Sequence, residues 1–181
     1  IEILEGIKEG VENTNYLVNL TDSKKYILTI FEKRVLPKEI PFFMKLMDNL
    51  NNSKINCPKP LKTKKNKYLI KLKDKTACIV SFLEGKDKKI LKTNDCYTIG
   101  KTIARMHVVT KKMKLNRKNS MGVRNLKPLL ESIKFKSKKF SNLKIFLRNN
   151  LKDINKNWPK QLPKGIIHGD LFIDNIFFKK N

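Results

Sequence analysis

The sequence predicts an α+β fold in two parts, an antiparallel sheet with one helix followed by a mainly helical region. Three observations support this prediction. Short segments of alternating apolar and polar residues, separated by turn residues, fill the chain up to residue 82. Apolar residues then recur at helical spacing from residue 93 onwards. Residues 83–87 follow neither pattern, so we expect the boundary between the two parts there.

The N-terminal part is expected to contain five strands and one helix. The strands cover residues 1–7, 15–20, 26–31, 67–72 and 76–82. Polar turns at residues 8–14 and 21–24 join the first three strands, as in consecutive antiparallel strands. Pro37 and Pro41 mark the start of a helix after the third strand, and its apolar residues recur at helical spacing up to Leu50.

The C-terminal part is expected to contain three helices. The first has Thr93 or Asn94 as its N-cap and an apolar side that runs from Cys96 to His107. We expect His107 to pack at the end of this helix, with a ligand role as the alternative. The other two helices cover residues 126–135 and 140–154.

Composition limits the classes of protein to which this chain can belong. No apolar run is long enough for a transmembrane helix. A net charge of +25 suggests nucleic-acid binding, yet only 5 of the 41 basic residues are Arg, the side chain that binds phosphates and bases bidentately. The lysines are spread along the chain, which favours a codon bias instead.

The chain contains three scattered cysteines, Cys57, Cys78 and Cys96. They suit neither a disulfide framework nor a zinc site, and they indicate a reducing compartment, the cytoplasm.

The most informative pattern is His168-x-Asp170-x-x-x-x-Asn175, within an apolar stretch at residues 165–178. This spacing is typical of a kinase catalytic loop, in which the Asp accepts the proton of the substrate hydroxyl as the phosphoryl group moves. The Asn reaches back with its carbonyl oxygen to hold Mg²⁺ against the phosphates. The flanking apolar residues are expected to hold this loop on the core. A packed histidine followed by a turn aspartate is the alternative.

The sequence resembles the homoserine kinases of the aminoglycoside/choline-kinase-like phosphotransferase group. The segments that carry the resemblance are residues 9–16, 26–34, 41–47, 81–85, 104–107 and 168–178. The last segment alone indicates only the superfamily, whereas Glu-Gly-Val-Glu-Asn-Thr-Asn at 9–15 and Phe-Glu-Lys-Arg at 31–34 indicate homoserine kinase. The resemblance implies a protein-kinase-like two-lobed fold. Its parts would be a nucleotide-binding lobe at 1–82, a hinge at 83–87 and an incomplete, mainly helical catalytic lobe at 88–181.

The resemblance also implies an activity and the residues that perform it. The activity is transfer of the γ-phosphate of ATP to the hydroxyl of L-homoserine, a step of threonine biosynthesis, with Mg²⁺ as cofactor. Asp170 would be the catalytic base, His168 would brace the loop and Asn175 would hold the metal. The nucleotide would be bound by Gly10, Val11, Asn13, Thr14 and Asn15 over the phosphates and by the backbone of Ser81, Phe82 and Leu83 at adenine. Without the resemblance, these two segments are an ordinary hairpin turn and a bare edge strand.

Two departures from the family pattern are visible. Thr29 stands where many relatives carry a Lys or Arg that pairs with the phosphates, and Lys33 or Arg34 is the candidate replacement, with Glu39 as a weak candidate partner. No second metal-binding Asp follows the loop, and the resemblance also expects residues before Ile1. We therefore expect an internal fragment of a longer enzyme, which by itself binds Mg-ATP poorly and turns over negligibly.

Other functions stay open at this point. The first alternative is another phosphotransferase of the same superfamily, acting on choline, an aminoglycoside or a sugar alcohol. A non-catalytic pseudokinase is the second, because the strand lysine and the second metal ligand are not visible. A basic nucleic-acid-binding domain is the third, although no basic motif with interleaved aromatic residues supports it. We expect a small-molecule substrate and neither a specific nucleic acid nor a membrane as partner.

Overall fold

The computed structural model describes residues 1–8, 13–32, 36–134 and 140–179. Contacts between residues divide the chain into two compact units, which are described separately. The first unit comprises residues 1–116 and 165–181, and the second comprises residues 117–164. This grouping places the candidate catalytic loop in the same unit as the sheet. The lobe boundaries at residues 82 and 88 stay a prediction.

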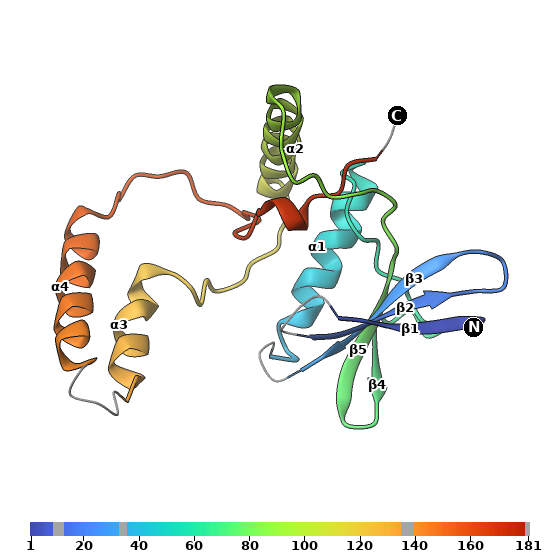
Figure 1. Cartoon of the computed structure of the whole chain (residues 1–181), viewed down its shortest axis with the longest axis horizontal. Helices are drawn as coiled ribbons and strands as arrows, with labels where there is room; N and C mark the ends of the chain where they lie inside the picture. Colours follow the sequence, from blue (N-terminus) through green and yellow to red (C-terminus); the bar gives the residue numbers. More distant parts are fainter. Residues whose placement is uncertain (9–12, 33–35, 135–139, 180–181) are drawn as a thin grey trace. The chain divides into compact units, whose positions relative to one another are not determined.

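The first unit is built on a five-stranded antiparallel sheet, which confirms the predicted sheet (Figure 1). Its strand order is β1-β2-β3-β5-β4, so β5 lies between β3 and β4. The strands are β1 (Ile3–Ile7), β2 (Asn13–Asn19), β3 (Lys25–Phe31), β4 (Leu69–Leu72) and β5 (Lys75–Ser81). Strand β2 begins two residues earlier than the sequence predicts, because Asn13 and Thr14 pair with Phe31 and Ile30 of β3.

Helix α1 (Ile40–Asn52) packs on the sheet through the apolar residues of its first two turns. Ile40 and Met44 are buried against Cys78 and Val80 of β5. Burial of an aliphatic side chain of this size contributes about 1.5–3 kcal/mol. Figure 1 shows α1 running along the sheet. The helix begins as predicted, with proline in its first turn, and the N-cap residue is Glu39.

Helix α2 (Thr93–Lys111) follows the segment that leaves β5. Its N-cap is Lys92, and not Thr93 or Asn94, because the carboxylate of Asp95 accepts the backbone N–H of Lys92 at 3.0 Å. Asp95 also forms an ion pair with Lys88 at 2.5 Å. Asp95, in the first turn, therefore binds two residues that precede the helix, Lys88 and Lys92.

The packed side of α2 differs from the expected one at its ends. Ile99, Ile103 and Met106 are partly buried, as their spacing predicts. Cys96 and His107 are exposed, so the expectation that His107 packs at the helix end is wrong. Both residues lie on the flank of the helix beside the stripe of partly buried side chains, which turns them toward solvent.

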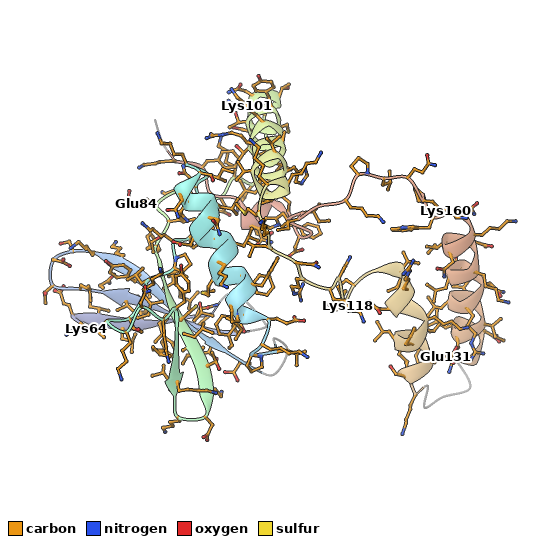
Figure 2. All side chains as sticks on the ribbon, turned by 180° about the vertical axis from the view of Figure 1, so that it is seen from behind. Lys64, Glu84, Lys101, Lys118, Glu131 and Lys160 are labelled. Atoms are coloured by element: carbon orange, nitrogen blue, oxygen red, sulfur yellow. The ribbon has the colours of Figure 1, made fainter. Side chains whose placement is uncertain are left out.

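The second unit contains α3 (Val123–Ser132) and α4 (Ser141–Asn157). Arg148 of α4 donates from Nε and Nη2 to the two carboxylate oxygens of Glu131 of α3, at 2.9 and 2.7 Å. Lys144 lies 3.4 Å from the same carboxylate. Figure 2 labels Glu131, whose carboxylate joins the two helices by ion pairs. Of the helices that the structure describes, none combines the length and apolar character needed to span a bilayer.

Candidate active site

The candidate catalytic loop is closed by the side chain of Asn175. Gly169 turns the chain with a φ of 80°, a conformation that residues with a Cβ rarely adopt. The 3₁₀ helix η2 (Ile173–Asn175) then brings Asn175 back to Asp170. Its amide nitrogen Nδ2 donates to the backbone oxygen of Asp170 at 2.9 Å and to the carboxylate oxygen Oδ2 at 3.2 Å. The structure therefore brings these two side chains together.

His168 contacts the same turn through its ring. The nitrogen Nδ1 accepts a long hydrogen bond, 3.4 Å, from the backbone N–H of Asp170. Because Nδ1 accepts, the proton of a neutral ring is assigned to Nε2. His168 thus contacts the backbone of Asp170, whereas Asn175 contacts the Asp170 carboxylate.

The loop is attached to the rest of the unit mainly by its backbone. The side chains of His168, Asp170 and Asn175 are exposed. Most apolar neighbours of the loop are exposed as well, namely Ile167, Leu171, Phe172, Ile173 and Phe177. The expectation that the flanking apolar residues hold the loop on the core is therefore wrong for most of them. A pair of backbone hydrogen bonds between Phe178 and Lys86 attaches the end of this stretch to the rest of the unit.

The expected phosphate-binding turn is described only in part. Gly10 and Val11 lie outside the described residues. Asn13, Thr14 and Asn15 are partly buried and form the first half of β2. The sequence suggests a turn up to residue 14, but the ladder to β3 already includes Asn13. The described part of this segment is therefore strand.

All three of these β2 side chains are hydrogen-bonded to β3 or to the residue that follows it. Thr14 Oγ1 donates to the Glu32 carboxylate at 2.8 Å, and Asn13 Oδ1 accepts the backbone N–H of Glu32 at 3.4 Å. Asn15 Oδ1 accepts the hydroxyl of Thr29 at 2.9 Å. These contacts fix the start of β2 against β3.

The structure also bears on the missing strand lysine. The Thr29 hydroxyl is used within the sheet, and Lys33 and Arg34 lie outside the described residues. Lys75, the first residue of β5, places its Nζ 2.7 Å from the Glu32 carboxylate at the same end of the sheet. Sequence reasoning missed Lys75, because its position follows only from the pairing of β3 with β5.

The expected adenine-binding segment begins at the last residue of β5. The backbone N–H of Ser81 donates to the oxygen of Lys59 at 2.8 Å, and that of Phe82 donates to the oxygen of Lys25 at 3.2 Å. Within the described part of the chain, the N–H of Leu83 has no such acceptor. Leu83 therefore offers the first free backbone donor after the sheet.

The three groups of candidate residues are connected to different degrees. His168, Asp170 and Asn175 contact one another. In the described ranges, no hydrogen bond or ion pair joins them to the β2 residues or to Ser81, Phe82 and Leu83. Two backbone hydrogen bonds link the loop to the segment after Leu83, through Phe178 and Lys86.

The oxygen atoms of the loop fit a small divalent cation. Nδ2 of Asn175 faces Asp170, which leaves Oδ1 and the Asp170 carboxylate as hard oxygen donors. Groups of three or more His, Cys, Asp and Glu side chains that could enclose a metal are absent from the residues that the structure describes. This donor set suits a cation that takes its remaining ligands from phosphates and water, as Mg²⁺ does.

Comparison with protein families decides what kind of loop this is. The model of the phosphotransferase enzyme family, APH, matches residues 3–181. The chain belongs to this phosphotransferase family. The match covers the sheet, the helices and the candidate catalytic loop, so it confirms the resemblance inferred from the sequence.

Two curated relatives of this phosphotransferase chain share a name. A homoserine kinase of Paramagnetospirillum magneticum is 42% identical over 175 residues, which are 96% of this chain and 53% of the relative. A homoserine kinase of Parvibaculum lavamentivorans is 39% identical, and the match covers 54% of its length. The chain spans about half the length of the curated relatives that it matches.

Solved structures of phosphotransferases share the fold. The amicoumacin kinase hAmiN, in complex with AMP-PNP, Ca²⁺ and Ami, superposes with a TM-score of 0.78 over 98% of this chain and 55% of its own. A spectinomycin phosphotransferase bound to ADP and spectinomycin gives a TM-score of 0.60, with 99% and 61% covered. At 17% and 16% identity, these likenesses confirm the predicted kinase-like fold alone.

Proposed function

We propose that the polypeptide carrying this chain is a kinase that transfers the γ-phosphate of ATP to the hydroxyl of L-homoserine and releases O-phospho-L-homoserine. The observation that carries the proposal is the contact between Asn175 and Asp170 within a phosphotransferase domain. The acceptor is inferred from the homoserine kinases that match nearly the whole chain. Threonine biosynthesis is the pathway that such a reaction serves.

Asp170 is the proposed catalytic base. Its carboxylate is exposed and accepts one hydrogen bond from Asn175, which leaves its remaining lone pairs for the acceptor hydroxyl. In the reaction this carboxylate orients the hydroxyl and takes its proton as the oxygen attacks phosphorus. Because the protein forms no covalent bond to the phosphoryl group, positioning and charge neutralisation supply most of the catalysis.

Asn175 is the proposed magnesium ligand. The hydrogen bonds from Nδ2 to Asp170 fix the orientation of its amide group, which aims Oδ1 away from Asp170. Bound Mg²⁺ would neutralise the negative charge of the phosphates. His168 holds the backbone N–H of Asp170 and keeps the turn in place for both side chains.

The nucleotide is proposed to bind between β2 and the end of β5. Leu83 would donate its free backbone N–H to adenine, beside the hydrogen-bonded groups of Ser81 and Phe82. Asn13, Thr14 and Asn15 would lie beside the phosphates, together with Gly10 and Val11. The three described residues are already hydrogen-bonded to Thr29 of β3 or to Glu32. Their side chains therefore lose little conformational freedom when a nucleotide binds.

The proposal is tested by assaying the intact polypeptide that carries these residues with ATP, Mg²⁺ and a panel of acceptors. The panel contains L-homoserine, D-homoserine, L-serine, choline, a sugar alcohol and an aminoglycoside. We expect phosphate transfer to L-homoserine with a specificity constant at least about 100-fold above every other acceptor, since an amino-acid acceptor is recognised through two charged groups. Mass spectrometry identifies the product.

Two results would contradict the proposed acceptor. Preferential phosphorylation of choline, a sugar alcohol or an aminoglycoside would assign the chain to another member of the superfamily. No transfer to any acceptor, with nucleotide still bound, would favour a pseudokinase. The 181-residue chain is assayed beside the intact polypeptide, and we expect negligible turnover from it alone.

A further inference from the structure

The segment that leaves β5 is paired with the segment that follows η2, although the two are far apart in sequence. The backbone N–H of Lys86 donates to the oxygen of Phe178 at 3.1 Å, and the N–H of Phe178 donates to the oxygen of Lys86 at 2.9 Å. The two residues thus form an isolated antiparallel bridge, which we call the linker bridge. Phe178 lies three residues after Asn175.

Gly85 allows the two segments to approach this closely. Its φ is 149°, a value that side chains with a Cβ rarely adopt. A Cβ built on Gly85 would lie 3.1 Å from Cβ of Phe177 and 3.1 Å from the backbone oxygen of Phe178. Both conformation and contact therefore require glycine at this position, and the second contact is with the oxygen that accepts the Lys86 N–H.

Side-chain contacts extend the linker bridge to α2. Nζ of Lys88 lies 4.3 Å from the ring centroid of Phe178, a cation–π contact. The same ammonium pairs with Asp95 at 2.5 Å, and the Asp95 side chain is largely buried, with 13% of it exposed. Asp95 also caps α2 through Lys92. The bridge is therefore connected to the start of a long helix.

We propose that the linker bridge sets the position of Asn175 relative to the backbone donor of Leu83, and that Gly85 is the positioning residue that permits it. The proposal rests on the proposed function, in which Leu83 binds adenine and Asn175 holds the metal. Leu83 lies two residues before Gly85, on one side of the bridge, and Asn175 lies three residues before Phe178, on the other. The proposed contacts with adenine and with the metal at the phosphates therefore both depend on one pair of hydrogen bonds. An ordinary structural glycine would affect stability without coupling the two ends.

The first test measures amide hydrogen exchange in the intact polypeptide, with Gly85→Ala compared with the wild type. We expect the amides of Asn175 and Phe178 to exchange at least about tenfold faster in the variant, because they lose the restraint of the bridge. Amides in the middle of β5 and α1 should keep their protection, which shows that the variant folds. Gly165→Ala is the matched control, because a Cβ there has no atom within 4 Å and φ is ordinary.

The second test separates positioning from general destabilisation. The dissociation constants of adenosine, of ATP and of ATP with Mg²⁺ are measured by titration for the three proteins. In Gly85→Ala, adenosine affinity should stay within about twofold, while the factor by which Mg²⁺ strengthens ATP binding falls at least about tenfold. The wild type and Gly165→Ala should keep that factor.

Each outcome has a defined meaning. Unchanged exchange at Asn175 and Phe178, or an unchanged effect of Mg²⁺, would overturn the positioning role of Gly85. A parallel loss of adenosine and Mg-ATP affinity would overturn it as well, because it would show a general structural defect. Failure of the wild type to bind adenosine would instead contradict the proposed nucleotide site, and the exchange rates would still decide whether the bridge holds the loop.

Discussion

Asn175 uses the two ends of its side-chain amide differently. Nδ2 is bound to Asp170, and Oδ1 is the end that the proposal assigns to a cation. A side-chain amide can donate through its nitrogen to a neighbouring carboxylate and still present a separate oxygen to a metal, which an ionised carboxylate cannot do. An aspartate at this position would set two carboxylates against each other. The residue type is thus dictated by its neighbour as well as by its ligand.

The three thiols of the chain are predicted to differ in reactivity. Burial raises the pKa of Cys57 and that of Cys78 to about 11, so almost none of either thiol is ionised at pH 8. Cys96 lies exposed on α2. Brief treatment of the native protein with iodoacetamide at pH 8 should modify Cys96 first, which peptide mass spectrometry can measure. Unfolded protein should be modified at all three cysteines, and equal labelling of the three in native protein would contradict the burial.

The role of a single residue could be predicted from the sequence only where the residue belongs to a recognisable motif. The spacing of Asp170 and Asn175 suggested that both face one site, and the structure brings them into contact. Gly85 could not be recognised, because the atoms that exclude a side chain belong to Phe177 and Phe178, which are distant in sequence. The hydrogen bond between Thr14 of β2 and Glu32 could not be predicted from the sequence either, since it arises from the pairing of β2 with β3.

Helices α3 and α4 are predicted to be linked in a pH-dependent way. The hydrogen bonds from Arg148 lower the pKa of Glu131 from 4.5 to about 2, and Lys144 adds to the effect. Because the folded pKa lies below the unfolded one, the ion pair stabilises the two helices fully above pH 4.5. Its contribution is lost as the pH falls from 4.5 toward 2.

An NMR titration of the Glu131 carboxyl carbon measures this directly. The expected midpoint is about 2, and a midpoint near 4.5 would contradict the pairing. In Glu131→Gln, thermal stability should fall less than in the wild type as the pH is lowered from 4.5 to 2. Asp153→Asn on α4 removes a carboxylate that is exposed, and it serves as the matched control.

Among the elements, those with a strong local pattern were predicted well. The alternation in β2, β3 and β5 and the prolines at the start of α1 located these elements to within a few residues. The sequence pattern predicted Thr93 or Asn94 as the N-cap of α2, whereas the structure has Lys92 in that position. The carboxylate that accepts the Lys92 N–H belongs to Asp95, inside the first turn of the helix. The position of β5 between β3 and β4 follows from pairing across the sheet, which no local pattern reports.

The basic residues that give the whole chain its charge are spread along the sequence. A net charge of +25 produces attraction to any polyanion, and such attraction falls steeply with salt concentration. The absence of a specific nucleic-acid partner stays a prediction. The family match and the loop geometry account for the chain without such a partner.

The chain spans about half the length of its curated relatives, so the activity must be measured on the intact polypeptide. The most direct measurement is phosphate transfer from ATP to L-homoserine by Asp170→Asn. Loss of a catalytic base should lower turnover by about 10²–10⁴-fold. Asp74→Asn, in the exposed turn between β4 and β5, removes the same charge outside the candidate site and should keep normal turnover. Affinity for ATP without Mg²⁺ should be preserved in both variants. Near-normal turnover in Asp170→Asn would remove Asp170 from the reaction and contradict the kinase mechanism proposed for this loop.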